Sequence, residues 1–312
     1  MTAPISLATH VGTVNLANPI MPASGTFDYH SSPRPPFDIH RLGALVLKSI
    51  TWNPQKGNPP PRLAETPSGL INSIGIPSPG MERFLGEVLP HYTVLNIPLV
   101  ASVAGYTPDE YARIAAELNS IAAVTAVELN LSCPNIAYHR MPAQDPALLK
   151  ECVAAARSET TKPLWAKLSP DVPSVGMMAA AAEASGADAC TVINTAQAMM
   201  VNIETGRPMI GAGMGGLSGP ALLPIALAAV WDVTLHTRIP VIGVGGIRSA
   251  DDVIAFLMAG ASAVQIGTAS FYNPSVMVQI LQDLNTFMAR KHFHSLAEII
   301  GMAHGAEIQE VR

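Results

Sequence analysis

One cysteine of this sequence follows an apolar run in a setting that could support chemistry. The stretch Glu128-Leu129-Asn130-Leu131-Ser132-Cys133-Pro134-Asn135 begins as a strand and is ended by a proline, so Cys133 is predicted to lie on the loop beyond it. Alternation along the strand turns Asn130 inward. A thiol on such a loop can act as a base or a nucleophile where its surroundings lower its pKa. An isolated cysteine is more often a small buried hydrophobe, and Cys152 and Cys190 are interpreted that way.

Two lysines and two further asparagines stand at comparable points of the sequence. Lys48 and Lys167 each close an apolar run, where a buried ammonium costs several kcal/mol unless an anion lies beside it. Asn72 and Asn194 add two more amides near the ends of other segments. Together with the asparagines of the cysteine stretch, these side chains suit a planar, anionic ligand that is rich in amide groups.

Other catalytic arrangements are missing from the sequence. No pair of carboxylates and no Ser-His-Asp order accompanies these residues, which argues against hydrolases. The nine histidines show no HExxH spacing and the three cysteines form no CxxC pair, so no protein-bound metal is expected. An iron–sulfur cluster would have to lie on another chain.

Two glycine-containing segments predict a phosphate site. Gly243-Val244-Gly245-Gly246-Ile247 and Gln265-Ile266-Gly267-Thr268 end the last two apolar runs, and glycine lets backbone N–H groups approach an anion closely. A helix that begins at Ser249 would add its positive end, as in the usual phosphate site of a barrel. The alternative is a pair of tight turns.

These residues need a scaffold that gathers the ends of many strands. Short runs rich in Val, Ile and Leu, each followed by polar residues and a helical pattern, are typical of a parallel α/β fold. Because no linker divides the chain, we expect one domain over residues 1–312, a (β/α)8 TIM barrel rather than two doubly wound halves. The eight candidate strands are residues 19–23, 44–49, 98–103, 126–131, 163–168, 189–193, 240–244 and 263–266.

The segments between strands show where two helices begin. Thr107-Pro108-Asp109-Glu110 has a capping residue followed by proline, and it predicts a helix over 111–118. Ser249-Ala250-Asp251-Asp252 predicts another helix over 253–258 in the same way.

Three further segments complete the predicted barrel. Residues 7–18 are expected to form an N-terminal β-hairpin that closes the bottom of the barrel. The segments 51–79 and 195–218 are too long for ordinary connections and follow strands two and six. We expect them to be long loops at the C-terminal face, where barrels bind ligands or partners.

Composition excludes several classes of protein. The chain has 312 residues, of which 49% are hydrophobic and 13% charged, so it is not a disordered chain. Its net charge of −5 gives no basic excess for nucleic acid. No run of about 20 apolar residues predicts a membrane span, and the N-terminus lacks a secretory signal. A cytoplasmic protein is expected.

Taken in order, these segments resemble the dihydroorotate dehydrogenase family across nearly the whole chain. Cysteine in the Ser-Cys-Pro-Asn motif resembles class 1, because class 2 has serine there and an N-terminal membrane helix. Two further segments resemble the class 1B catalytic subunit, namely Ala64-Glu65-Thr66-Pro67 and Gly215-Gly216-Leu217-Ser218-Gly219-Pro220. The other matching segments are Ala23-Ser24-Gly25, Gly43 to Lys48, Gly57-Asn58-Pro59, Asn72-Ser73-Ile74-Gly75, Asn130 to Asn135 and Gly243 to Ile247.

The resemblance implies an FMN-containing barrel that oxidises (S)-dihydroorotate to orotate in pyrimidine biosynthesis. In that family the motif cysteine takes a proton from C5 while a hydride leaves C6 for N5 of FMN, which assigns the base to Cys133. Lys48 would touch both flavin and substrate, and Lys167 the pyrimidine edge of the flavin. The implied substrate residues are Lys48, Asn72, Ile74, Gly75, Ile76, Asn130, Asn135, Asn194 and Thr195. The implied flavin residues are Ala23, Ser24, Lys48, Ser49, Asn130, Lys167, Ile193, Ser218 and Gly219, with the phosphate on Gly245, Gly246, Gly267 and Thr268.

The resemblance also implies partners. Class 1B enzymes form a dimer of FMN subunits, and each binds an electron-transfer subunit that carries FAD and a 2Fe-2S cluster and reduces NAD. A class 1 barrel could instead reduce fumarate directly, and the sequence leaves both acceptors open. Two departures from the family pattern concern turnover: the loop 136–142 lacks the usual glycine pair, and Gln55 stands where arginine is common.

Three other interpretations stay open from the sequence. A related flavin barrel that acts on uncharged dihydropyrimidines also has a cysteine near this strand end. A phosphosugar isomerase or lyase would use the phosphate site without flavin. A non-catalytic barrel would need neither Cys133 nor Lys48.

Overall fold

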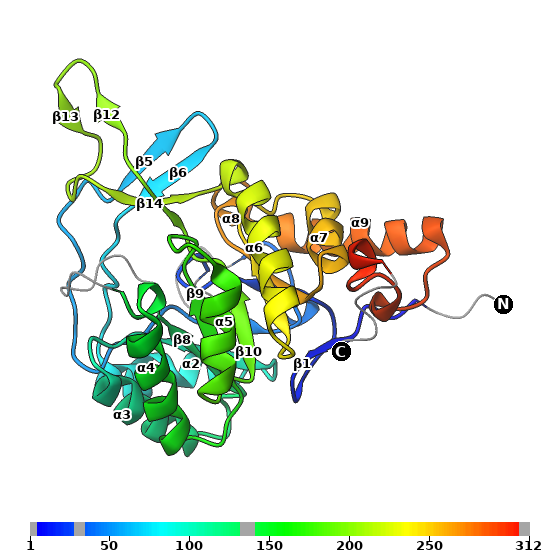
Figure 1. Cartoon of the computed structure of the whole chain (residues 1–312), viewed down its shortest axis with the longest axis horizontal. Helices are drawn as coiled ribbons and strands as arrows, with labels where there is room; N and C mark the ends of the chain where they lie inside the picture. Colours follow the sequence, from blue (N-terminus) through cyan, green and yellow to red (C-terminus); the bar gives the residue numbers. More distant parts are fainter. Residues whose placement is uncertain (1–4, 28–34, 132–140, 306–312) are drawn as a thin grey trace.

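The computed structural model describes residues 5–27, 35–131 and 141–305, and its centre is a sheet of eight parallel strands (Figure 1). In the order of their pairing, the strands are β3 (Ile20–Pro22), β16 (Ala261–Ile266), β15 (Val241–Val244), β10 (Ala189–Val192), β9 (Leu164–Leu168), β8 (Ala126–Asn130), β7 (Leu99–Val103) and β4 (Leu45–Val46). The outer strands β3 and β4 meet where the Gly43 N–H donates to the Ile20 carbonyl at 2.9 Å. The sheet is therefore nearly closed into a (β/α)8 TIM barrel, and all eight predicted strands are confirmed.

From β4 onward, helices connect consecutive barrel strands and cover the outside of the barrel (Figure 1). Both helices expected from their capping residues are present. The Thr107 hydroxyl accepts from the Glu110 N–H, and Ser249 and Asp252 form a reciprocal capping box. The helices are α1 (Met81–Arg83), continued by a π-helical turn at Phe84–Val88, α2 (Pro90–Thr93), α3 (Pro108–Asn119), α4 (Pro146–Glu159), α5 (Val175–Ala184), α6 (Leu223–His236), α7 (Ala250–Met258), α8 (Ala269–Tyr272) and α9 (Val276–Lys291).

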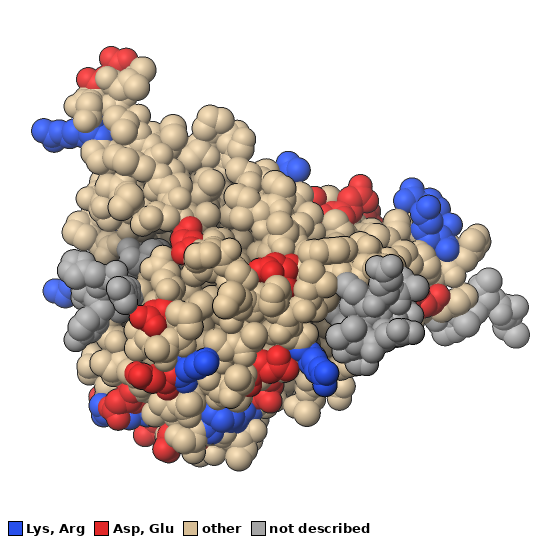
Figure 2. All heavy atoms as spheres, viewed as in Figure 1, with Lys and Arg blue, Asp and Glu red and all other residues tan. Residues whose placement is uncertain are grey.

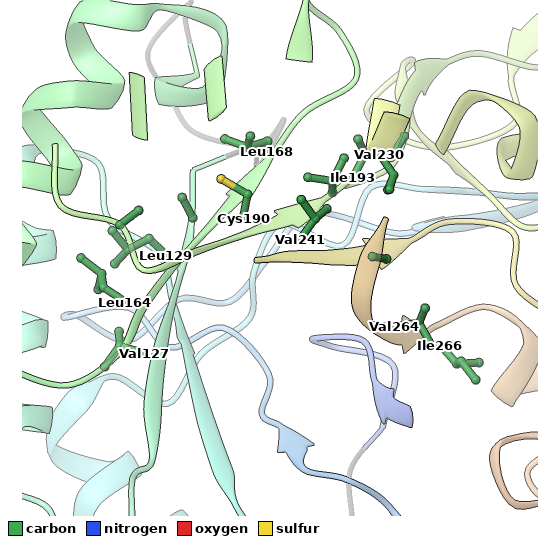
Figure 3. Close-up of a cluster of buried hydrophobic side chains, with 14 of the residues drawn as sticks. Val127, Leu129, Leu164, Leu168, Cys190, Ile193, Val230, Val241, Val264 and Ile266 are labelled. Carbon is green, nitrogen blue, oxygen red and sulfur yellow. The ribbon is translucent and has the colours of Figure 1, made fainter. Parts of the chain in front are cut away.

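Alternate residues of the barrel strands pack into two different apolar clusters, one outside the sheet and one inside the barrel. On β8, Val127 and Leu129 belong to the large apolar cluster that also holds the buried faces of the helices, and Figure 3 shows them with Leu164 and Cys190. The residues between them face the barrel axis. At the N-terminal end of the strands this inner layer is apolar, and it includes Ala126, Trp165, Ala189, Ile242 and Ala263.

The N-terminal segment closes the bottom of the barrel as predicted. Strands β1 (Thr9–Val11) and β2 (Val14–Leu16) pair antiparallel around Gly12, whose φ of 59° suits the tight turn. Val11, Val14 and Leu16 are buried in the same cluster as the apolar inner layer. The hairpin therefore covers the N-terminal end of the barrel strands, and a ligand site has to lie at their C-terminal end.

The two long segments lie at the C-terminal face as expected, and they also contain strands that the sequence did not predict. They contain β5 (Leu63–Thr66), β6 (Gly69–Asn72), β11 (Ala196–Ala198) and β14 (Gly215–Ser218), which form a second, antiparallel sheet in the order β11-β14-β6-β5. A further ribbon, β12 (Val201–Asn202) with β13 (Arg207–Pro208), projects from this sheet. The strands β14 and β6 are far apart in the sequence, and β14 begins with two glycines. Neither strand therefore shows the alternation of apolar and polar residues from which a strand could be predicted.

Charged side chains are unevenly distributed on the surface. In Figure 2 they gather over α3 and α4 and at the tip of the β12–β13 ribbon, whereas the region over α6 and β14 shows few. Several large apolar side chains are exposed on the second sheet and its ribbon, including Met199, Val201, Ile203 and Met214. Within the described residues, no helix has the length and hydropathy that a membrane crossing needs.

Candidate active site

A cavity of about 920 Å³ opens between the C-terminal ends of the barrel strands and the second sheet. This volume is near the upper end of the range for small-molecule sites, so a cofactor and a substrate fit together. Every predicted site residue that the structure describes lines it. They are Ala23, Ser24, Lys48, Ser49, Asn72, Ile74, Gly75, Ile76, Asn130, Lys167, Ile193, Asn194, Thr195, Ser218, Gly219, Gly245, Gly246, Gly267 and Thr268.

Two predicted residues, Cys133 and Asn135, lie outside the described residues, as does most of the glycine-free loop 136–142. The described part of that strand ends at Leu131, one residue after Asn130. The sequence therefore continues toward Cys133 from a strand end that already lines the cavity.

A chain of hydrogen bonds joins polar side chains along one wall of the cavity. Asn130 donates from Nδ2 to the Ser49 hydroxyl at 3.0 Å, and Ser49 also bonds to the Ser24 hydroxyl at 3.2 Å and to that of Ser102 at 2.9 Å. Asn194 donates to Oδ1 of Asn130 at 3.5 Å. These bonds connect five strand ends, so Asn130 and Asn194 are held side by side.

The opposite wall comes from the second sheet. Asn72, at the end of β6, donates from Nδ2 to the Gly216 carbonyl of β14 at 3.1 Å. A Cβ at Gly216 would lie 1.9 Å from Oγ1 of Thr195, so glycine is needed where the two segments cross. The Asn58 amide donates to the Ser73 hydroxyl at 2.7 Å and holds the loop that follows Asn72 against the sheet.

Glycines shape the end of the cavity where the phosphate was predicted. Gly245 and Gly246 have φ values of 133° and 74°, and a Cβ at Gly246 would lie 2.5 Å from the Leu223 nitrogen. Nearby, the Thr268 hydroxyl donates to that of Ser218 at 2.8 Å. Because these glycines have no side chain, an anion can approach their backbone closely.

The helix that begins at Ser249 carries a capping box at its start. The Asp252 carboxylate accepts hydrogen bonds from the backbone N–H groups of Arg248 and Ser249, so the start of α7 is capped by its own side chain. Ile247 and Arg248 line the cavity, whereas Ser249 does not. Both of these N–H groups precede the first residue of the helix, so a contribution of the helix end to the phosphate site stays a prediction.

The two predicted lysines differ in their surroundings. Lys48 is exposed to the cavity, so its charge is not a buried one. Lys167 is 5% exposed, and its Nζ lies 3.9 Å from Oε1 of Glu128, which is fully buried. The protein itself therefore supplies an anion beside Lys167, which sequence reasoning missed.

The position of Glu128 on the barrel axis could have been predicted from the sequence. It precedes Asn130 by two residues on one strand, so alternation turns both side chains to the same inner face. Gln265 also faces the cavity and is buried. Other lining residues that the sequence did not single out include Thr26, Leu63, Glu65, Arg248, Phe271 and Tyr272. In the described part of the chain, no group of three or more His, Cys, Asp and Glu residues could hold a metal ion.

The remaining cysteines lie in the apolar core, as the sequence predicted. Cys152 on α4 is 1% exposed and Cys190 on β10 is fully buried. Burial raises the pKa of the Cys152 thiol to about 12, and it raises the pKa of Cys190 as well. Because the thiolate is the reactive form, both residues are inert near neutral pH.

We therefore expect iodoacetamide to leave Cys152 and Cys190 unmodified in the native protein at about pH 8. At that pH each thiol stays protonated, since its pKa is raised above its ordinary value, and each is covered by packed side chains. Peptide mass spectrometry after labelling measures this directly, with urea-unfolded protein as the control that labels both. Labelling of either cysteine before unfolding would contradict the packing described here.

Comparisons with known proteins indicate one family. A model of the family described as dihydroorotate dehydrogenase matches residues 6–288. A dihydroorotate dehydrogenase B (NAD(+)) catalytic subunit of Trichlorobacter lovleyi is 42% identical over 301 residues, covering 96% of this chain and 99% of its own. The protein of the same name from Thermodesulfovibrio yellowstonii is 43% identical over 296 residues, covering 95% and 98%. A Solibacter usitatus protein named putative dihydroorotate dehydrogenase A (fumarate) is 42% identical over 296 residues, covering 95% and 97%.

Proposed function

The chain belongs to the dihydroorotate dehydrogenase family, and from that premise we propose how its residues carry out the reaction. The enzyme is a flavoprotein that oxidises dihydroorotate to orotate in pyrimidine biosynthesis. One observation carries the assignment of roles: a single cavity brings together three of the four predicted asparagines, both lysines and the glycines at the strand ends. We propose that the whole chain, residues 1–312, acts as one domain around this cavity.

We propose FMN as the flavin, because the cavity residues fit its phosphate and its ring. Gly245 and Gly246 leave backbone bare at one end, where an added Cβ on Gly246 would collide with Leu223. Lys167 lines the cavity and makes no hydrogen bond within the described residues, which suits an anionic ring edge. When bound, FMN accepts the hydride that the substrate loses. The residues proposed for the phosphate are Gly245, Gly246, Gly267 and Thr268, and those proposed along the rest of the flavin are Ala23, Ser24, Lys48, Ser49, Asn130, Lys167, Ile193, Ser218 and Gly219.

The chain's own side chains bind the substrate and move its proton. In our proposal the Cys133 thiolate removes the proton from C5, the hydride departs from C6, and the C5–C6 double bond of orotate forms. Amide groups of Asn72, Asn130 and Asn194, which line one cavity, hold the ring and the carboxylate. Lys48 contacts the substrate from the same cavity and adds a positive charge for its carboxylate. Asn135 and the segment Ile74 to Ile76 with Thr195 complete the proposed substrate site.

The names of the relatives bear on the electron acceptor. Several are catalytic subunits of NAD(+) enzymes, which implies a separate electron-transfer subunit, and we propose that it carries FAD and a 2Fe-2S cluster. The relative named for fumarate is equally similar, so sequence identity alone does not separate the acceptors. Activity with NAD that depends on the added subunit, without fumarate activity, is the expected result. Fumarate reduction by the chain alone would contradict the NAD assignment.

We also propose a homodimer of these chains. The exposed apolar side chains on the second sheet and its ribbon support association with another protein surface. Light scattering of the purified chain should give twice the mass of 32.7 kDa. A monomer at micromolar concentration would argue against the dimer.

A Gly246→Ala substitution should weaken the binding of the flavin. The new Cβ meets the Leu223 nitrogen at 2.5 Å with φ at 74°, so the loop must move away from the phosphate. We expect the Kd for FMN to rise by about tenfold or more, the effect of losing roughly 1.4 kcal/mol. The ratio of flavin absorbance to protein after purification measures it.

Gly213→Ala is the matched control for this substitution. Gly213 has a similar φ of 80° but has open space around it and does not line the cavity. Both variants suffer similar backbone strain, so only Gly246→Ala should lose flavin. Equal flavin content in the two variants would remove the loop from the proposed phosphate site.

The choice of substrate separates this function from its nearest alternative. A barrel that acts on uncharged dihydropyrimidines needs no cation for a substrate carboxylate, whereas we propose that Lys48 of this cavity supplies one. We expect reduction of the flavin by dihydroorotate, competitive inhibition by orotate, and no comparable reduction by dihydrouracil. Equal reduction by dihydrouracil would favour the alternative.

A further inference from the structure

A polar layer on the barrel axis includes Lys167 of the proposed flavin site and three residues to which the proposed function gives no role. It is formed by Glu128, Lys167, Thr191 and Gln265, which come from β8, β9, β10 and β16. Each stands two residues beyond a member of the apolar inner layer, so alternation places all four on the barrel axis. All four are at least 95% buried.

The Glu128 carboxylate is held asymmetrically within this layer. Its Oε2 accepts hydrogen bonds from the Thr191 hydroxyl at 2.9 Å and from Nε2 of Gln265 at 2.6 Å. Its Oε1 accepts none within the described residues and lies 3.9 Å from Nζ of Lys167. Two neutral donors therefore fix the carboxylate and leave its other oxygen toward the ammonium.

The gap between Glu128 and Lys167 is longer than a hydrogen bond, so their attraction is between charges. Lys167 also lines the cavity, which Glu128 does not. The lysine thus lies between a buried carboxylate below and the space for the ligand above.

We propose that Glu128 is a positioning residue whose buried charge keeps the Lys167 ammonium at the cavity wall. This inference rests on the proposed flavin site. An ammonium buried without a counter-charge is costly, so without Glu128 the Lys167 ammonium is no longer held at this wall. The cavity then loses the positive charge that stabilises reduced, anionic flavin.

The midpoint potential of the bound flavin tests the proposal in the intact protein. In Glu128→Gln we expect the potential to fall by about 30 mV or more, which for a two-electron couple is an about tenfold loss of preference for reduced flavin. Lys167→Met should lower it in the same direction. Adding Glu128→Gln to Lys167→Met should then change little, because the lysine through which Glu128 acts is already gone.

Thr191→Val is the control for this experiment. It removes one hydrogen bond from Oε2 of Glu128 but leaves both charges, so its potential should match the wild type. If Glu128→Gln does not fold, Glu128→Asp withdraws the carboxylate from Lys167 and should give a smaller fall. An unchanged potential in the folded Asp variant contradicts the proposal.

The outcomes separate this inference from the function on which it rests. A higher potential in Glu128→Gln would mean that the carboxylate acts on the flavin directly, and additive shifts in the double variant would mean the same. An unchanged potential would make Glu128 purely structural. A wild-type chain that binds no flavin would instead overturn the proposed function before any variant is compared.

Discussion

In a Cys133→Ser variant, reduction of the bound flavin by dihydroorotate is expected to slow by a factor on the order of 10² or more near neutral pH. Serine keeps the size of the side chain, but a hydroxyl is a far weaker base than a thiolate. Cys133 follows Asn130, which lines the cavity, by three residues. FMN should stay bound, because no residue proposed to hold it has changed. Stopped-flow absorbance under anaerobic conditions measures the rate.

Cys152→Ser is the matched control, since it makes the same exchange of sulfur for oxygen in the apolar core. That variant should lose some stability and reduce its flavin at the wild-type rate. Wild-type reduction in Cys133→Ser would remove the cysteine from the mechanism. Loss of flavin from Cys133→Ser would show that its role is in binding instead.

A Lys48→Ala variant is the second large expected effect. Hydrogen bonds to charged groups contribute about 1.5–3 kcal/mol, so kcat/KM for dihydroorotate should fall by roughly 10- to 100-fold. Because the lysine is proposed to contact both substrate and flavin, KM should rise and the reduction rate should fall together. Steady-state and single-turnover kinetics separate the two.

Lys150→Ala serves as the control, because Lys150 is exposed on α4 and does not line the cavity. Its kinetics should match the wild type. If Lys48→Ala changed only the melting temperature, Lys48 would be a structural residue. If it changed KM alone, its contact with the flavin would be wrong.

The barrel was predictable because each strand has its own local signal. Strands buried on both faces read as short apolar runs, and capping residues marked the starts of α3 and α7. The second sheet had no such signal. Its strands have three or four residues, and the pair β14–β6 joins segments more than 140 residues apart, so tertiary pairing and not local propensity creates them.

The cavity residues were predictable for a related reason. Strand ends of a barrel meet at one face, so polar residues at the ends of apolar runs come together regardless of their distance in sequence. The polar layer beneath them was harder to predict. Glu128 and Gln265 lie within strands. The role of a polar residue inside an apolar run cannot be predicted until its partner on another strand is known.

The start of α7 shows the limit of motif reasoning. Ser249 and Asp252 were predicted to cap each other, and they do. The same motif was expected to offer a helix end to the phosphate. Asp252 accepts from the N–H groups of Arg248 and Ser249, which precede the helix, so a motif that identifies a helix start does not by itself identify a ligand at that start.

The most direct test of the account is to mix the purified chain anaerobically with dihydroorotate, without any partner, and follow the flavin absorbance band. We predict a yellow protein whose band bleaches on mixing, because the cavity holds the proposed residues for both flavin and substrate in one chain. A flavin-containing protein that does not bleach with dihydroorotate would contradict the assigned substrate site.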